Sequence, residues 1–462
     1  MQTELDRKSR NIILILFLVG VFMGSLDTGI IGPVLPAIEQ TYNLTSRESS
    51  WIYTLFVITF MIGTPVMAKL SDFYGRKKIF IIDTVLFAVG SALIAFSQYI
   101  WMVYLGRIIQ GFGSGGLYPI ANAFIGDAFP LDERGKALGL LGSVFGIAAI
   151  GGPLLGALLI PYGWNLCFMI NLPISIAVVI LALYILPGVE NHGKLIMDYS
   201  GMIVLIILST LLAFGLNQID SNNFVQSLVS VNVAPFLLAF VIIFPLFIRI
   251  EKRAEESLVP IHLFKNTEIT IASAETFCCG MIYSSVIFIP SLVMLSMGFN
   301  NQQASLMLLP ILASNAIAAP LIGKILDGAG SRKILNIGTL LITIGLIILV
   351  LYPSSTVIFI LAGCLVGIGF VTLMGSPVRY ILLCEAKPNE RGASQAIVNM
   401  LLSIGQLLGG ALMGGVIASF SGILGFQISL IIAAATGVVA FISSLKLKSR
   451  DEQRKAMIEN SS

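Results

Sequence analysis

The hydrophobic pattern of the chain consists of long apolar runs separated by short polar loops. A helix needs about 20 consecutive apolar residues to cross the hydrocarbon core of a bilayer. Fourteen windows of this kind lie at residues 11–36, 49–68, 79–98, 101–126, 135–160, 164–187, 199–216, 229–250, 269–296, 302–325, 333–352, 355–384, 392–418 and 422–445. The pattern predicts an all-α membrane protein in which two groups of six spans flank two additional spans.

The polar loops contain an internal repeat. Segment 68–78 (AKLSDFYGRKK) returns about 255 residues later as segment 323–333 (GKILDGAGSRK), and each copy lies between long apolar runs. The tripeptide Glu-Arg-Gly also occurs twice, at 133–135 and 390–392, with nearly the same offset. Repeats of this size are typical of transporters built from two related halves.

The repeat and the spans divide the chain into four parts. We expect an N-terminal six-helix half at 1–187 and a C-terminal six-helix half at 267–446. Between them, residues 188–266 hold the two additional spans and a charged linker. Residues 447–462 form a short tail of mixed charge, which we expect to fray.

Composition supports a membrane protein and excludes other classes. Hydrophobic residues make up 56% of the 462 residues, charged residues 11%, and the mean hydropathy is +0.95, too apolar for a soluble fold. The net charge of +3 is small and its basic residues lie in short loops, so nucleic acid is not an expected partner. The five cysteines lie in apolar runs and only two histidines occur, so no disulfide, metal site or cofactor is expected.

Motifs of nucleotide-driven proteins are missing from the sequence. Segment 111–116 matches GxGxxG, but it lies inside a predicted span and follows no strand, so it is not a nucleotide-binding fingerprint. The sequence contains no Walker loop and no cluster of catalytic side chains. We therefore expect a protein that is not an enzyme and that draws its energy from a gradient.

The positions of lysine and arginine predict the orientation. Nearly all of them fall at the termini and in the even-numbered loops, whereas Arg47 alone lies in a loop on the opposite side. Because cytoplasmic loops are enriched in Lys and Arg, both termini are predicted to be cytoplasmic in a multi-pass protein of the cell membrane. Arg107 and Arg379 fall inside predicted spans, and Arg379 is expected to snorkel to the interface or to pair with Glu385.

At these motifs the chain resembles a known family, the major facilitator superfamily, and within it the fourteen-span drug:proton antiporter branch. Segment 72–77 is similar to the family's loop signature between spans two and three, although Ala68 stands where the family usually has glycine. Segments 26–36 and 106–111 resemble its first-span and fourth-span motifs. A fifth-span motif that the resemblance associates with exchangers is matched by Gly146, Gly151, Gly152, Pro153 and Gly156.

Ionisable side chains inside the spans are the candidates for proton coupling. A charge at the bilayer centre costs at least about 2.5 kcal/mol unless it is paired or hydrated. Asp27 lies roughly 14 Å and Arg107 about 9 Å below the outer ends of their spans, and the reach of the arginine closes most of that gap, so we expect the two to interact. A partner that moves away would change the affinity of Asp27 for a proton. We assign Asp27, Arg107 and Glu275 to this role. The alternatives are a permanent Asp27–Arg107 salt bridge that only fixes packing and, for Glu275, a hydrated structural carboxylate.

Buried polar side chains are the candidates for the substrate cavity. Arg107, Gln110, Ser114 and Tyr118 form one polar stripe on an otherwise apolar helix, which is expected to face a cavity. Polar contacts that hold helices together are the alternative. The full candidate set is Gln110, Ser114, Tyr118, Asn122, Asn171, Tyr283, Asn315 and Asn399.

The repeated polar loops are the candidates for a gate. A short loop with both charge signs can pair with the other half when the cytoplasmic side is closed, and opening would break those pairs. The residues assigned to this gate are Asp72, Gly75, Arg76, Lys77, Arg134, Asp327, Arg332 and Lys333. By their positions, Asp83 and Asp127 are expected to belong to the same cluster of charges. Simple anchoring by positive charge is the alternative.

Together these features predict a monomeric, proton-coupled efflux antiporter for amphipathic drugs or organic cations. Its partners would be a small-molecule substrate, protons and the lipid bilayer. The rival hypothesis is a dedicated exporter of a lipid, a lipid-linked sugar or another metabolite on the same fold.

Overall fold

The computed structural model describes residues 6–44, 46–188, 198–219, 224–254, 257, 259–299, 301–387, 390–420 and 422–459, in which every regular element is a helix. The first half contains α1 (Arg7–Tyr42), α2 (Ser46–Tyr74), α3 (Arg76–Ala95), α4 (Ile100–Ala128), α5 (Leu131–Leu159), η1 (Ile160–Tyr162), α6 (Leu166–Met169) and α7 (Asn171–Ile185). The middle contains α8 (Tyr199–Asn217), α9 (Phe224–Leu228), α10 (Ala234–Arg253) and η3 (Ile261–Lys265).

The second half repeats the pattern of long helices. It contains α11 (Thr267–Ser284), η4 (Ser285–Phe288), α12 (Ile289–Met297), α13 (Asn301–Leu306), α14 (Leu309–Ala329), α15 (Ser331–Leu351), α16 (Thr356–Met374), α17 (Ser376–Glu385), α18 (Arg391–Ser419) and α19 (Ile423–Ser444), followed by α20 (Arg450–Glu459).

Among the described residues, 12 helical segments are long and apolar enough to cross a membrane, so the chain is a multi-pass membrane protein. The predicted number of fourteen is not reached by this measure. The two long helices outside the twelve are α4 and α5, which are 29 residues long each. Glycines and polar side chains dilute the hydropathy of α4, and several side chains of α5 lie outside the described set.

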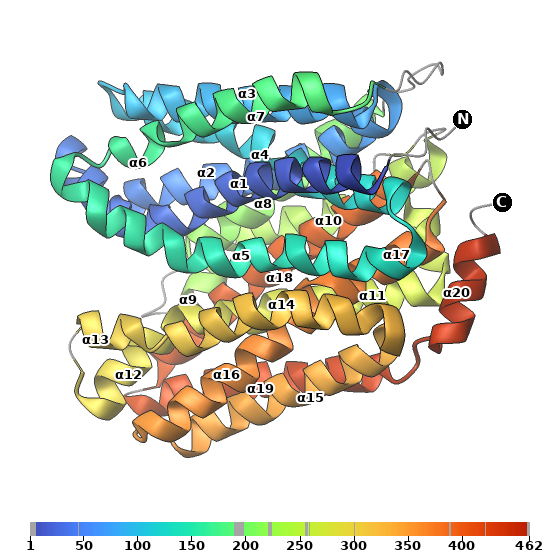
Figure 1. The fold of residues 1–462 in the computed structure, drawn as a ribbon. Helices are drawn as coiled ribbons and strands as arrows, with labels where there is room; N and C mark the ends of the chain where they lie inside the picture. Colours follow the sequence, from blue (N-terminus) through green and yellow to red (C-terminus); the bar gives the residue numbers. More distant parts are fainter. Residues whose placement is uncertain are drawn as a thin grey trace.

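The long helices run roughly alongside one another in two groups (Figure 1). The helices of the first half form one group, those of the second half form the other, and α5 lies beside α14 at the boundary (Figure 1). Helices α8 and α10 pack against each other, and α8 also contacts α2. Helix α1 begins and α19 ends at the same end of the bundle, which we call the termini end.

Small residues permit the close contact between the halves. A Cβ atom added to Gly139 of α5 would lie 2.8 Å from the Cα atom of Gly323 on α14, and one added to Gly146 would lie 2.8 Å from the Cα atom of Ala316. No side chain fits at these distances, so the two backbones touch directly. Small-residue contacts of this kind are the usual way in which membrane helices approach closely.

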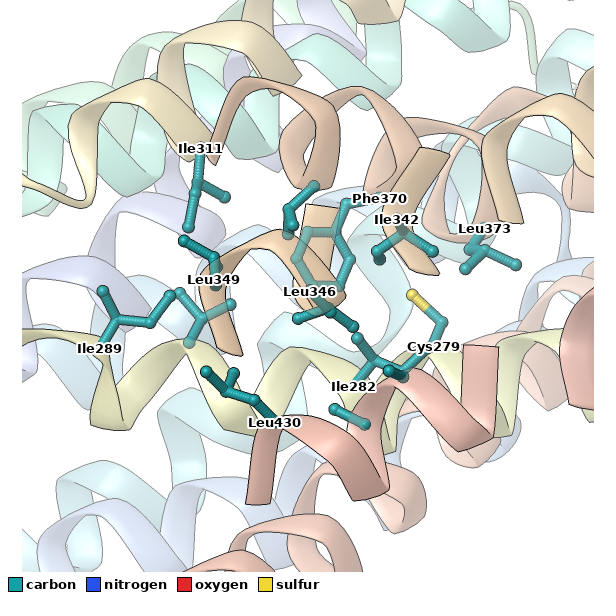
Figure 2. Close-up of a cluster of buried hydrophobic side chains, with 14 of the residues drawn as sticks. Cys279, Ile282, Ile289, Ile311, Ile342, Leu346, Leu349, Phe370, Leu373 and Leu430 are labelled. Atoms are coloured by element: carbon teal, nitrogen blue, oxygen red, sulfur yellow. The ribbon is translucent and has the colours of Figure 1, made fainter. Parts of the chain in front are cut away.

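The second half has an apolar core built from its own helices. In the second half, Ile342, Leu346 and Leu349 of α15 pack with Phe370 of α16 and Ile282 of α11 (Figure 2). All five side chains are at most 1% exposed. A second cluster, built mainly from helices of the first half, extends across the boundary to Leu326 and Leu383, so the two halves also share apolar contacts.

A break divides one long span of the second half into α16 and α17. Pro377 occupies the first turn of α17, where its missing N–H leaves no helical hydrogen bond unmade. Gly375 precedes this turn and has a backbone conformation, φ −96° and ψ −144°, that is not helical. The break brings the first turn of α17, including Arg379, beside α4 and α5 of the first half.

The tail is ordered rather than frayed, which corrects the sequence-based expectation for residues 450–459. Helix α20 docks on the second polar loop, where the backbone N–H of Ser331 donates to Gln453 Oε1 at 3.3 Å. Lys448, just before α20, donates from Nζ to Glu385 Oε1 at 2.6 Å, and its backbone N–H donates to Glu268 at 2.8 Å. These contacts fix the tail to α11, α15 and α17.

Candidate transport site

The structure brings Asp27 of α1 and Arg107 of α4 together in the interior of the first half. Arg107 Nη1 donates to Asp27 Oδ2 at 2.6 Å, and neither side chain is more than 1% exposed. Arg107 Nε donates to the carbonyl of Ile52 at 3.0 Å, and its guanidinium lies 4.2 Å from the ring centroid of Phe56. The arginine is therefore held by α1, by α2 and by its own helix.

Amide and hydroxyl groups complete the surroundings of Asp27. Gln110 Nε2 donates to Asp27 Oδ1 at 2.8 Å and to Ser91 Oγ at 2.9 Å. Asn171 Nδ2 donates to Asp27 Oδ1 at 3.4 Å and to Ser91 Oγ at 3.2 Å. Five side chains from α1, α3, α4 and α7 thus form one buried network, which we call the Asp27 network. Ser91 was not among the predicted site residues, because a serine in an apolar run gives no signal of its own.

Close packing of α3 and α4 positions this network. A Cβ atom on Gly90 of α3 would lie 2.6 Å from the carbonyl oxygen of Gly106 on α4. The absence of both side chains lets Ser91 approach Gln110. The network therefore depends on the glycine contact between α3 and α4, because the hydrogen bonds to Ser91 would be too long without it.

The predicted cavity residues do not gather at one place. Gln110 and Asn171 belong to the Asp27 network, and Ser114 lies near α1, since a Cβ atom on Gly24 would meet its hydroxyl at 2.9 Å. Tyr283 packs on Phe370 inside the second half, with ring centroids 5.3 Å apart. The remaining four are Tyr118, Asn122 and Asn399, which meet at the boundary of the halves, and Asn315, which is partly exposed on α14.

The boundary group is centred on Arg379. From the sequence, this side chain was expected to snorkel to the interface or to pair with Glu385, and it does neither. Its side chain does not snorkel, because it is 2% exposed. Its guanidinium carbon lies 3.9 Å from the ring centroid of Tyr118, and Nη2 donates to Asn399 Oδ1 at 2.8 Å. No salt bridge to Glu385 or to any other described carboxylate is formed; Glu385 instead pairs with Lys448.

Glu275 lies apart from the Asp27 network. Ser443 Oγ of α19 donates to Glu275 Oε1 at 2.6 Å, and Glu275 is 0% exposed. The hydrated position considered from the sequence is therefore wrong in this structure. Glu275 points between α11 and α19, within the second half.

Ion pairs at the termini end link the two halves. Asp127, at the end of α4, accepts hydrogen bonds from Arg76 of α3 at 3.2 Å and from Arg391 of α18 at 2.8 Å. Arg391 also donates to the carbonyl of Gly126 at 3.1 Å, and Arg76 pairs with Asp72. Asp127 was expected in this cluster from its position in the sequence, whereas Arg391 was not in the predicted gate, because the repeated loops give no signal for the helix end that they contact.

Asp72 also reaches across the boundary. A Cβ atom on Gly392 would lie 2.7 Å from both carboxylate oxygens of Asp72, so the carboxylate sits at the first turn of α18. The N-terminus of a helix carries a partial positive charge and unpaired N–H groups, which favour a carboxylate there. Gly75, with φ 92°, makes the turn before α3 that aims the loop in this direction.

The other predicted gate residues differ in their surroundings. Lys77 Nζ donates to the carbonyl of Leu183 at 2.7 Å, and Arg134 Nε donates to that of Phe129 at 2.9 Å. Both of these contacts stay within the first half. Arg332 and Lys333 are exposed, and their loop contacts α20. The side chain of Asp327 lies outside the described residues.

Asp83 of α3 is buried without polar contacts. Its exposure is 0%, and neither carboxylate oxygen has a hydrogen-bond partner among the described residues. Its place in the ion cluster at the termini end, which its sequence position suggested, is therefore wrong. The side chain packs between α3 and α4, close to Gly116.

The fifth-span motif faces two helices. A Cβ atom on Gly152 would lie 2.7 Å from the Cα atom of Gly29 on α1, and one on Gly156 would lie 3.2 Å from Pro33. Gly146 instead faces Ala316 of α14, and Gly151 has only ordinary contact with Leu26. The side chain of Pro153 lies outside the described set. The motif therefore fits α5 between the helix that carries Asp27 and the opposite half.

Known proteins share this architecture. The chain is 31% identical over 425 residues to the uncharacterized MFS-type transporter YfiU of Bacillus subtilis, covering 90% of this chain and 81% of that protein. It is 29% identical over 423 residues to multidrug resistance protein 3 of the same organism, with the same coverage. The crystal structure of the human organic anion transporter MFSD10 has the same fold, with a TM-score of 0.72 over 95% of this chain and 100% of that chain, at 14% identity.

The family comparison gives the same result. The model of the Major Facilitator Superfamily matches residues 17–263 and 271–460. Proteins of this family are membrane transporters of small molecules and not enzymes. With its two groups of helices and its buried polar network, the chain belongs to the major facilitator superfamily.

Proposed function

We propose that the protein is a proton-coupled efflux antiporter for amphipathic, drug-like molecules. One observation carries this proposal: Asp27 is a buried carboxylate whose three hydrogen-bond partners come from two other helices, α4 and α7, in a network that extends to α3. A proton bound to Asp27 would cancel its attraction for Arg107 and convert one carboxylate oxygen from an acceptor to a donor. The four helices could then rearrange, so that proton binding and the helix arrangement depend on each other.

The drug-like substrate class is supported by similarity and by composition. Multidrug resistance protein 3 and two further relatives that are named as multidrug proteins are 25–29% identical to this chain. The chain is 56% hydrophobic, and we expect the substrate path to be lined mostly by apolar side chains. Apolar pockets with few polar groups recognise shape loosely, which suits several substrates.

We further propose that α4 and α5 also span the membrane, for a total of fourteen. Each is 29 residues long, which gives a length of about 43 Å at 1.5 Å per residue, more than the hydrocarbon core requires. Both also pack along helices that are spans themselves: α4 along α2 and α3, and α5 along α1 and α14. We place the termini end in the cytoplasm of a bacterial cell, because the basic residues gather there.

The pairs made by Asp127 and Asp72 support a gate at the cytoplasmic end. They join α3 and α4 of one half to α18 of the other, so they must break before this end can open. The structure then represents a state with a closed cytoplasmic gate. Alternation between this state and one with a broken gate is the motion that antiport requires.

The function can be tested in proteoliposomes with an acidic lumen. A fluorescent amphipathic dye should accumulate inside while the lumen becomes alkaline, and a protonophore should abolish both changes. Protein-free liposomes correct for passive entry of the dye. Dye uptake that does not depend on the proton gradient would contradict the proposal.

Export of a lipid is a second candidate, favoured by one feature. An apolar groove of about 480 Å³ lies between α1 and α7 and is lined by residues such as Leu16, Val19 and Ile174. The same proteoliposomes, loaded with a fluorescent phospholipid, would test it. Movement of the phospholipid between leaflets, without movement of dye, would favour this candidate.

A further inference from the structure

A buried arginine without a carboxylate partner lies where the two halves meet. Arg379 belongs to α17 of the second half, and the ring that covers it, Tyr118, belongs to α4 of the first half. The guanidinium stays charged under physiological conditions. In the part of the chain that the structure describes, no carboxylate lies within ion-pairing distance of it.

The hydrogen-bonding capacity of this arginine is largely unused. Of its five N–H groups, one donates to Asn399, and the nitrogens Nε and Nη1 have no partner among the described residues. Gln395 and Asn399 belong to the same group, since Gln395 Nε2 donates to the carbonyl of Arg379 at 3.1 Å. Gln395 Oε1 and Asn399 Nδ2 are likewise buried and unpartnered within the described structure.

Such an arrangement is costly unless it is used. A buried charge without a partner costs several kcal/mol, of which a cation–π contact returns about 2 kcal/mol. In contrast, Arg107 has a carboxylate and an amide for its charge. The stability of the fold therefore does not explain why an arginine occupies position 379.

We propose that Arg379 binds an anionic group of the transported molecule, a carboxylate, sulfonate or phosphate, with Tyr118 as its cover in the closed state. This inference rests on the proposed transport function and narrows its substrates to amphipathic acids. When the cytoplasmic gate opens, Tyr118 moves away with the first half. The unpartnered N–H groups of Nε and Nη1 can then donate to oxygens of the anion, and such charge-assisted hydrogen bonds are among the strongest that arginine makes.

The same geometry disfavours organic cations as substrates. A cation at this site would meet the charge of Arg379, and the two carboxylates assigned from the sequence face elsewhere: Asp27 binds Arg107, and Glu275 points to Ser443. An acidic substrate is neutralised by Arg379 itself and does not require a carboxylate of the protein as its charge partner. Substrate charge is thus the property that separates the two substrate classes.

A matched pair of dyes tests the inference: a rhodamine with a free benzoic acid, and the methyl ester of the same dye. Proton-driven uptake is measured in proteoliposomes with the parent protein, Arg379→Gln, Arg379→Lys and the control Arg249→Gln, which removes an exposed arginine on α10. We expect the parent to prefer the acid. Arg379→Gln should raise the KM for the acid by about tenfold or more without changing that for the ester, and Arg379→Lys should restore part of the affinity.

The outcomes separate this inference from the proposed function. If the parent transports the ester in preference to the acid, or if Arg379→Gln transports the acid as well as the parent does, the inference is wrong while transport stands. If Arg379→Gln does not fold, the preference of the parent decides. If neither dye is transported, proton-driven efflux of such dyes is contradicted. Fluorescence polarisation of both dyes with the purified parent then still tests the anion site. Equal binding of the acid and the ester would overturn the inference.

Discussion

Arg391 of α18 donates a hydrogen bond to Asp127 of α4 at 2.8 Å and thereby joins the two halves at the termini end. A hydrogen bond between charged groups contributes about 1.5–3 kcal/mol. Its removal should shift the ratio of closed to open gates by about tenfold. Arg391→Gln should therefore open this end more often.

The thiol of Cys384 provides the readout for this prediction. It is buried on α17 near Arg391 and Arg134 and has 0% exposure. We expect maleimide to label Cys384 about tenfold faster in Arg391→Gln than in the parent, with peptide mass spectrometry to resolve the site. Arg249→Gln is the control. Equal labelling rates in Arg391→Gln and the parent would mean that this pair does not hold the gate.

Two neighbouring glycines of α5 should respond differently to alanine. A Cβ atom at Gly152 would meet the backbone of Gly29 at 2.6 Å, whereas one at Gly151 would meet only the side chain of Leu26 at 3.5 Å. Gly152→Ala should cost about 1–3 kcal/mol of stability through overpacking. Gly151→Ala should be neutral or gain up to about 1 kcal/mol, because alanine favours the helix.

The measurement is the thermal stability of the purified variants, combined with dye uptake. Gly152→Ala should melt at lower temperature and transport less, and Gly151→Ala should match the parent in both. Equal behaviour of the two variants would contradict the close contact between α5 and α1.

Asp83 and Asp27 form a second matched pair. Asp83 has no hydrogen-bond partner in the described structure, so Asp83→Asn breaks no contact and removes a group that is costly to bury. Asp27→Asn leaves Arg107 without its charge partner, which costs about 3 kcal/mol or more when a buried pair is broken. Melting curves should place Asp83→Asn at or above the parent and Asp27→Asn below it. The opposite order would show that Asp83 has a partner and Asp27 does not depend on one.

The apolar pattern predicts most of the fold, because the length of a bilayer span and the spacing of loops are local properties. The contact between Asp27 and Arg107 is also predicted from the sequence, because charges buried in the membrane must be compensated and their depths can be estimated from the loops. The role that the pair plays stays a prediction.

The sequence does not provide the rotation of each helix about its own axis, which decides the neighbours that its polar side chains meet. Arg379 lies near the end of an apolar run, which favours snorkelling, but the break between Gly375 and Pro377 turns α17 inward against Tyr118. Likewise the two polar loops are similar in sequence, yet the first contacts α18 and the second contacts α20. Partners that lie far away in the chain decide these outcomes, and a repeated motif does not specify them.

Proton-driven uptake by Asp27→Asn tests the central claim most directly. The parent and Asp27→Asn are reconstituted at equal density, with the exposed-carboxylate variant Asp451→Asn as control, and dye uptake and lumenal pH are recorded together. We predict that the rate of gradient-driven dye uptake is at least about tenfold lower in Asp27→Asn than in the parent, while dye equilibration without a gradient persists. Uptake and lumenal alkalinisation at the parental rate in Asp27→Asn would contradict proton coupling through Asp27.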